Sequence, residues 1–311
     1  MSSGDSRQSS RTGAGSQERG PVLLVGASGR VGRLVVHHWP KSVPLLASQR
    51  RPPMRTDGFL WSPLDGPSAL LDHLARIGVQ PCALVMLVGV TPAPGISEAE
   101  LQGNQVLAMA CLAAAQTAGI QRVLLASSSA VYGVEAKGQP FAETALPAPL
   151  SPYGRAKLAM EAVAEPYRQA GLDVVSLRIG NVAGADALLH PLTAALRTSG
   201  PRTPVRIDTF ADGLGPLRSY IGPQTMARVL ANLSLFPSRL PEVLNLAAPG
   251  PVRMAALATA TGWPCMMVPA PATAHQSITL DCSRLARLCP MVEKDSDPAA
   301  MVAQWKATLP A

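Results

Sequence analysis

The chain has 311 residues, of which 47% are hydrophobic and 15% are charged, a composition typical of a globular protein rather than a disordered one. Its net charge is +7, but the Lys and Arg residues form no basic run and aromatic residues make up only 4%. The charge therefore favours an anionic small molecule over nucleic acid as a partner. No apolar run reaches the roughly 18–20 residues that cross a bilayer, so we expect no membrane segment.

Residues 1–20 are rich in Ser, Gly, Gln and Arg and contain no apolar stretch, which excludes a secretory signal and predicts a disordered tail. The five cysteines form no Cys-x-x-Cys pair. An odd count without a secretion signal indicates a reducing compartment, so we expect a cytoplasmic protein. No His, Cys or Glu grouping has the spacing of metal ligands, and we expect no metal site.

Apolar runs and helical patterns alternate along residues 21–180. The expected strands are 21–25, 43–47, 83–88, 122–126 and 173–177, and the expected helices are 30–38, 65–77, 98–118 and 151–170. This alternation predicts an α/β fold with a Rossmann-type, doubly wound parallel sheet. Residues 181–311 contain many prolines and short expected helices at 224–235, 254–261 and 299–309. We expect them to form a smaller substrate lobe, partly interleaved with the sheet.

A glycine-rich turn directly follows the first expected strand. Glycines at this spacing allow a tight turn and a close approach of backbone to a pyrophosphate, and the following helix presents its N-terminal N–H groups to the phosphates. In an alternating α/β chain this pattern predicts dinucleotide binding. The residues expected to bind the cofactor here are Gly26, Ser28, Gly29, Arg30, Val31 and Gly32.

The end of the second expected strand carries arginines where NAD-binding proteins of this fold carry a carboxylate. Arg50 and Arg51 stand there, and no Asp or Glu occurs before Asp57. A carboxylate would accept from the ribose 2′-hydroxyl of NAD, whereas a guanidinium pairs with the 2′-phosphate of NADP. We therefore expect NADP as the cofactor and keep NAD as the alternative.

Tyr153 and Lys157 are four residues apart on an expected helix and so share a face. A lysine ammonium near a phenol lowers the pKa of the phenol, and such a tyrosine can exchange a proton with a substrate hydroxyl or carbonyl. Ser128 follows the fourth expected strand, at the carboxyl edge where ligands bind in such sheets. Its hydroxyl can hold the reacting oxygen.

With these motifs the chain resembles the extended short-chain dehydrogenase/reductases, specifically the NAD-dependent epimerase/dehydratase group. The matching segments are GASGRVG, SSSAVYG, YGRAK, LRIGNVAG and RSYIG. The resemblance implies a Ser/Tyr/Lys triad, in which Ser128 matches the family serine and Ser129 is the second choice. It also implies an active-site asparagine at Asn104, substrate contacts at Asn181 and Arg218, and an adenine contact at Asp65. Helices 98–118 and 151–170 are expected, by the same resemblance, to pair in a homodimer.

We therefore expect an NAD(P)-dependent oxidoreductase or epimerase that acts on a hydroxyl or carbonyl of a sugar-like substrate, such as a nucleotide sugar. The alternative is a non-catalytic protein that senses a dinucleotide and binds partner proteins. The chain departs from the family after residue 221, where Gly222-Pro223-Gln224 replaces the usual Asp pair. This departure concerns the substrate and leaves the expected chemistry unchanged.

Overall fold

The structure is a computed structural model that describes residues 20–50, 58–134, 138–196 and 202–309. The expected N-terminal tail, apart from Gly20, and Arg51 lie outside the described residues.

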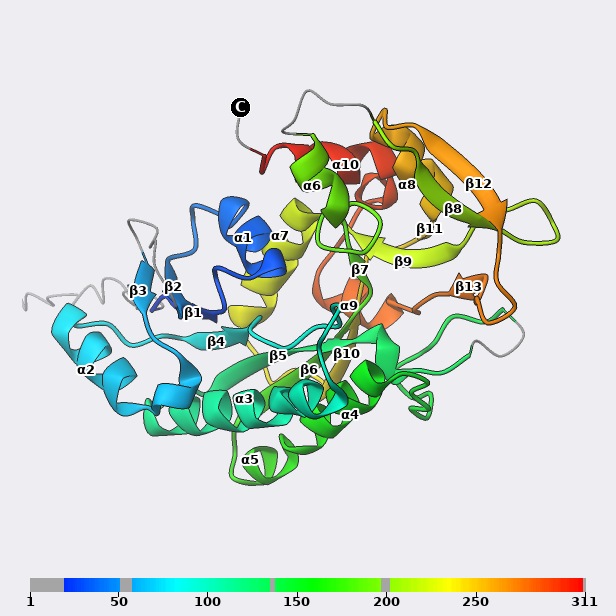
Figure 1. Ribbon diagram of the computed structural model, residues 1–311. Coiled ribbons are helices and arrows are strands. Elements are labelled where there is room, and N and C mark those ends of the chain that lie inside the picture. Colours follow the sequence, from blue (N-terminus) through cyan, green and yellow to red (C-terminus); the bar gives the residue numbers. More distant parts are fainter. Residues whose placement is uncertain (1–19, 51–57, 135–137, 197–201, 310–311) are drawn as a thin grey trace, which may run out of the picture.

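A seven-stranded parallel sheet forms the centre of the described molecule (Figure 1). Its strand order is β10-β6-β5-β4-β1-β2-β3. Read from β3, the first six strands follow the Rossmann order, which confirms the predicted doubly wound sheet. The strands are β1 (Val22–Val25), β2 (Leu45–Gln49), β3 (Gly58–Leu60), β4 (Ala83–Met86), β5 (Arg122–Ser128), β6 (Asp173–Ile179) and β10 (Val243–Leu246).

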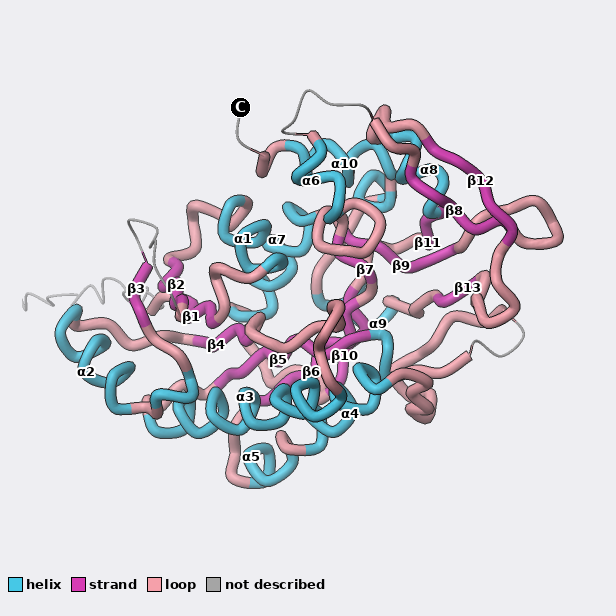
Figure 2. The backbone as a smooth tube through the Cα atoms, viewed as in Figure 1, coloured by secondary structure: helices cyan, strands magenta, loops and turns pink. Residues whose placement is uncertain are grey.

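Helices cover both faces of this sheet (Figures 1 and 2). On one face lie α1 (Arg30–His37) and α7 (Pro223–Ser234), and on the other lie α2 (Ser68–Ile77), α3 (Glu98–Thr117) and α4 (Pro152–Ala162). Successive side chains of a strand point to opposite faces, so β1 contributes Val22 and Leu24 to the first core and Leu23 and Val25 to the second. Strand β1 is apolar throughout because both faces of the sheet are buried at this strand.

The residues after β6 build a second layer above the carboxyl edge of the sheet (Figure 1). A small sheet contains β11, β9, β13 and β7, and β8 pairs with β12 separately. Within the same stretch of sequence, α7 and β10 return to the main sheet. The strands are β7 (Asn181–Val182), β8 (Val205–Thr209), β9 (Leu217–Ile221), β11 (Pro251–Arg253), β12 (Cys265–Pro269) and β13 (Ser277–Ile278); the helices are α6 (His190–Ala195), α8 (Met254–Ala260), α9 (Ser283–Leu288) and α10 (Pro298–Lys306).

The helix expected over 151–170 is interrupted. It ends at Ala162, and a separate helix α5 (Glu165–Gln169) begins after a turn, with Pro166 in its first turn. Proline has no N–H to bond the carbonyl four residues earlier, so a continuous helix is disfavoured here. The second strand begins at Leu45 rather than 43, directly after Pro44, which cannot donate to a ladder.

Among the described residues, no helix combines the length and the apolar character needed to cross a membrane.

Candidate active site

The glycine turn after β1 depends on two glycines that cannot carry a side chain. Gly26 has φ +97°, and a Cβ built on it would lie 2.6 Å from the amide nitrogen of Val88. A Cβ on Gly32 would overlap the carbonyl oxygen of Gly26. Gly29 is different, because its Cβ would meet only that same carbonyl oxygen, at 3.2 Å. Gly29 is exposed at the N-terminus of α1, so the backbone here is open to a phosphate, and the turn fits a dinucleotide.

The first turn of α4 places Tyr153 beside the end of β5. The Ser151 hydroxyl caps the helix by accepting from the Gly154 amide at 3.0 Å. A Cβ on Gly154 would overlap the carbonyl oxygen of Ala130, so only glycine allows this helix to approach so closely. Tyr153 and Ser128 share a side-chain hydrogen bond. The structure thus brings the predicted tyrosine and the first-choice serine into contact.

Lys157 is 4% exposed and lies under Tyr153. Its Nζ donates to the Ala126 carbonyl at 2.8 Å and lies 5.9 Å from the centroid of the Tyr153 ring. Burial lowers the pKa of Lys157 to about 8, while the nearby carboxylate of Glu161 opposes this shift. Lys157 therefore stays protonated near neutral pH, although withdrawing its charge from water costs free energy.

The pKa of Tyr153 moves in the direction opposite to the prediction. We expected Lys157 to lower it, but burial raises it, and the hydrogen bond with Ser128 offsets only part of this effect. The reason is physical: the phenol is largely withdrawn from water, which disfavours the phenolate, and the lysine nitrogen bonds a backbone carbonyl rather than the phenol oxygen.

A buried ion pair below Lys157 was missed by the sequence analysis. Arg178 of β6 donates from Nη2 to Oε2 of Glu161 at 2.8 Å, and its Nε also contacts both carboxylate oxygens. Ser127 donates a further hydrogen bond to Glu161. Arg178 Nη1 donates to the Tyr132 hydroxyl at 3.0 Å. Two features of the sequence could have indicated this ion pair: an arginine inside an otherwise apolar strand, and a glutamate four residues after Lys157.

One cavity of about 660 Å³ brings together seven of the predicted site residues. It lies at the carboxyl edge of the sheet, between the sheet and the second layer, where ligands bind in this fold. The predicted residues that line it are Arg30, Val31, Ser128, Ser129, Tyr153, Asn181 and Arg218. Thr91 and His275 also line it and were not predicted.

The guanidinium of Arg218 is fixed by backbone oxygens. Nη1 donates to the carbonyls of Leu217 and Gln276 at 2.8 and 2.9 Å, and Nη2 donates to that of His275 at 2.7 Å. These three backbone oxygens hold the guanidinium in one orientation at the cavity wall. Asn181 lies opposite Tyr220 in the β7–β9 pairing and hydrogen-bonds its hydroxyl.

The other predicted residues do not line this cavity: Gly26, Ser28, Gly29, Gly32, Arg50, Asp65, Asn104 and Lys157. Asn104 is fully buried and bonds only backbone in the described structure, accepting from Val90 N at 3.1 Å and donating to Val90 O and Leu101 O. Asp65 accepts from the Ser62 amide within a tight turn. Arg50 is exposed directly after β2. By bonding both backbone groups of Val90, Asn104 holds the loop after β4 in place.

Gly89 is a further residue of this loop that the sequence analysis did not select. A Cβ on it would lie 2.8 Å from Oδ1 of Asn104 and 3.4 Å from Nζ of Lys157. The absence of a side chain lets the loop lie directly over the lysine.

Comparison with known proteins agrees with this geometry. The NAD dependent epimerase/dehydratase family matches residues 22–198. A UDP-glucose 4-epimerase of Azospirillum brasilense is 31% identical over 175 residues, which are 53% of this chain and 50% of the relative. The chain thus spans about half the length of this curated relative.

Solved structures resemble the chain over nearly its whole length. MoeE5 in complex with UDP-glucose and NAD is 26% identical, with a TM-score of 0.71, covering 94% of this chain and 100% of that one. A UDP-glucose-4-epimerase from Stenotrophomonas maltophila with bound NAD and formylated UDP-arabinopyranose gives a TM-score of 0.75 at 20% identity, covering 93% and 98%. The family match covers more than half of the chain, and the protein belongs to the NAD dependent epimerase/dehydratase family.

Two glycines of the turn predict different outcomes for the same substitution. Gly29→Val should fold but lose dinucleotide binding, because its side chain would project where phosphates approach the backbone. Gly32→Val, the matched control, should fail to fold normally because its Cβ overlaps backbone. Circular dichroism and calorimetric titration with NADPH separate the two effects. Dinucleotide binding by folded Gly29→Val at wild-type affinity would contradict this role of the turn.

Lys157→Met should raise the free energy of unfolding at pH 7. The folded pKa of about 8 lies below the ordinary 10.5, and each tenfold change in protonation equilibrium corresponds to about 1.4 kcal/mol. The gain should be on the order of 1–3 kcal/mol, since the lost bond to Ala126 offsets part of it. Between pH 8 and 10.5 the unfolded wild-type chain binds more protons than the folded chain does. The stability of the wild type therefore rises with pH, and the advantage of the variant shrinks.

Urea unfolding across this pH range measures the effect, with the exposed Lys41→Met as the matched control. A Lys157→Met protein that is less stable than the wild type at pH 7 would show that the lysine is not buried as a charge.

Proposed function

We propose that the protein is an NAD(P)-dependent oxidoreductase or epimerase that acts on a hydroxyl or carbonyl of a sugar-like substrate, such as a nucleotide sugar. The observation that carries the proposal is the hydrogen bond between Ser128 and Tyr153 in one cavity with Arg30 of the dinucleotide turn. A sensor that only binds a dinucleotide has no need of a proton donor at that place.

Tyr153 is the group that moves the proton. Its raised pKa keeps the phenol protonated near neutral pH, which suits donation to a carbonyl oxygen during reduction, and the reverse step returns the proton to the phenolate. Ser128 holds the same substrate oxygen through its hydroxyl. Lys157, whose Nζ lies 5.9 Å from the centroid of the ring, would favour the phenolate by its positive charge, and the family resemblance implies that it bonds the ribose of the cofactor.

A bound nicotinamide supplies or accepts the hydride, and its oxidised form adds a positive charge that favours the phenolate of Tyr153. The turn around Gly29 would hold the pyrophosphate, and Arg30 beside it adds a charge at the boundary with the substrate cavity. Tyr153 is half-buried and lines the cavity, so a bound substrate would displace water from the phenol. Each of these contributions comes from residues that the fold already fixes.

The substrate carries an anionic group remote from the reacting carbon. Arg218 and Asn181 line the same cavity as Tyr153, and the fixed guanidinium of Arg218 suits a phosphate oxygen. UDP-glucose bound to MoeE5 has this combination of sugar and diphosphate. Return of the hydride to the same substrate would give an epimerase, and its release with the cofactor would give a dehydrogenase or reductase.

NADP is the proposed cofactor, with NAD as the alternative. Arg50 is exposed at the carboxyl end of β2, which is where the ribose of the adenosine lies in this fold. Asp65, expected at the adenine, is already bonded to the Ser62 amide, so its contact with the base would have to use its second oxygen.

The homodimer and the cytoplasmic location are proposed on separate grounds. Val106 and Met109 of α3 are 56% and 50% exposed, and such apolar side chains on a long helix favour a partner helix. All five cysteines are free thiols, as expected in a reducing compartment.

Tyr153→Phe should reduce turnover by about 10²- to 10⁴-fold, because it removes the proton-transferring hydroxyl and leaves the ring in place. Cofactor affinity and circular dichroism should stay at wild-type values. A panel of nucleotide sugars, followed at the reduced-nicotinamide absorbance and by product analysis, provides the assay. Tyr167→Phe on α5 is the matched control, and the proposal fails if Tyr153→Phe retains wild-type turnover on a substrate of the wild-type protein.

Arg50→Ala should remove most of a preference for NADPH over NADH, since a hydrogen bond to a charged group contributes about 1.5–3 kcal/mol. Titration of both cofactors measures the preference. Arg206→Ala removes an exposed arginine on β8 and should leave the preference intact. Equal or tighter binding of NADH by the wild type would contradict the cofactor assignment.

A further inference from the structure

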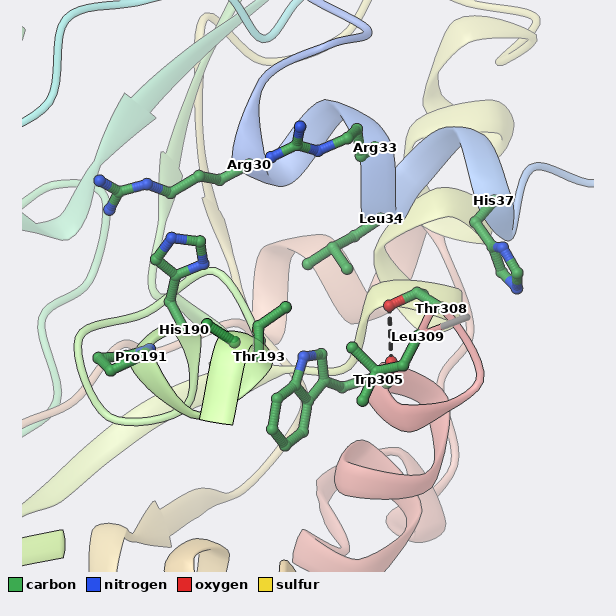
Figure 3. A pocket seen from close by; sticks show the side chains of 12 residues that line it. Arg30, Arg33, Leu34, His37, His190, Pro191, Thr193, Trp305, Thr308 and Leu309 are labelled. Carbon is green, nitrogen blue, oxygen red and sulfur yellow. Dashed lines mark hydrogen bonds between the residues drawn. The ribbon is translucent and has the colours of Figure 1, made fainter. Parts of the chain in front are cut away.

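A second cavity of about 550 Å³ lies between α1, α6 and α10, on the other side of Arg30 from the candidate active site. Figure 3 shows His190 and Thr193 rising from α6 toward α1, which carries Arg30 and Arg33, with Trp305 of α10 below. Nothing in the proposed reaction uses Arg33, His190 or Thr193.

The wall of this cavity carries positive charge without a counter-charge. Arg30, Arg33 and His190 line it, and no Asp or Glu of the described residues does so. His190 is close enough to both arginines for their charges to lower its pKa, although burial is the larger cause. Neither guanidinium bonds another described residue, whereas Arg178 and Arg228 are each paired with a carboxylate.

The unpaired guanidinium groups point to an acceptor-rich ligand. The hydroxyl oxygen of Thr193 is inaccessible to solvent and forms no hydrogen bond with a described residue. A ligand in the cavity therefore does not bond this oxygen, and recognition rests on the arginines.

The rest of the cavity is apolar. Leu34, Trp305 and Leu309 line it opposite the charged groups, and the volume exceeds what an isolated phosphate fills. An anion with an organic part would cover this surface and place its oxygens at the arginines.

We propose that this cavity binds the phosphate group of an organic phosphomonoester, at a site separate from the dinucleotide and substrate cavity. Arg33 and Arg30 pair with the phosphate oxygens. Arg30 lines both cavities, so occupation of one site changes the position of a charge in the other. By reciprocity, the ligand and the dinucleotide alter each other's affinity by the same factor. This coupling rests on the proposed function, but the binding itself does not.

Calorimetric titration with phenyl phosphate at constant ionic strength tests the site. The wild type should bind one equivalent saturably, and more tightly than it binds inorganic phosphate, because the ring covers the apolar wall. Arg33→Ala should weaken binding at least about tenfold, the loss expected for a charge-assisted hydrogen bond. Thr193→Val, which replaces a hydroxyl that the cavity does not reach, should change the affinity by less than about twofold. Arg287→Ala removes an exposed charge on α9 and should change the affinity by less than about twofold.

The folded Gly29→Val protein separates this proposal from the proposed function. It should still bind phenyl phosphate at wild-type affinity while failing to bind NADPH. The proposal is overturned if the wild type shows no saturable binding, if Arg287→Ala loses as much affinity as Arg33→Ala, or if NADPH displaces phenyl phosphate completely. Displacement would place the anion in the dinucleotide cavity.

Discussion

The buried pairing of Glu161 with Arg178 is the interaction on which the rest of the site depends. It ties the face of α4 that carries Lys157 to β6, and Ser127 of β5 bonds the same carboxylate. Through the Tyr132 hydroxyl it continues to Asn245 of β10, so the last strand of the sheet is held to the same unit. Replacing a buried ion pair with apolar residues is often neutral for stability. Its role here is therefore geometric and electrostatic: it fixes α4 against the sheet and compensates the charge of Lys157.

This arrangement explains why a costly group persists in the core. Lys157 is withdrawn from water, and its ammonium is kept by one carboxylate and one carbonyl oxygen. The loop after β4 closes over it without a side chain at Gly89. Tyr153 is placed above it by a capped helix that approaches the loop after β5 closely because of Gly154. The fold thus keeps a charged lysine beneath a protonated phenol at the expense of stability.

The sequence predicted the parts of the site that depend on local spacing. The alternating apolar runs predicted the parallel sheet, and the glycine spacing predicted the turn after β1. The four-residue spacing of Tyr153 and Lys157 placed both on one helical face. What it could not predict depends on tertiary contacts. The pKa direction of Tyr153 was wrong because burial cannot be read from spacing. Asn104, an active-site residue by the family resemblance, bonds the backbone of the β4 loop, a contact that spacing does not reveal, and its role in the active site stays a prediction. Glu161 and Arg178 meet only when α4 packs on β6.

Both cavities meet at Arg30, at the N-terminus of α1, so the first helix links the dinucleotide turn to the cationic cavity above it. The central claim remains the buried charge of Lys157, and its direct measurement is a pH titration of isotopically labelled lysine by nuclear magnetic resonance. The account predicts a Lys157 pKa near 8 in the wild type. In Glu161→Gln it should be lower still, because the carboxylate that favours the ammonium is gone. A pKa near the ordinary 10.5 in the wild type, unchanged in Glu161→Gln, would contradict the account.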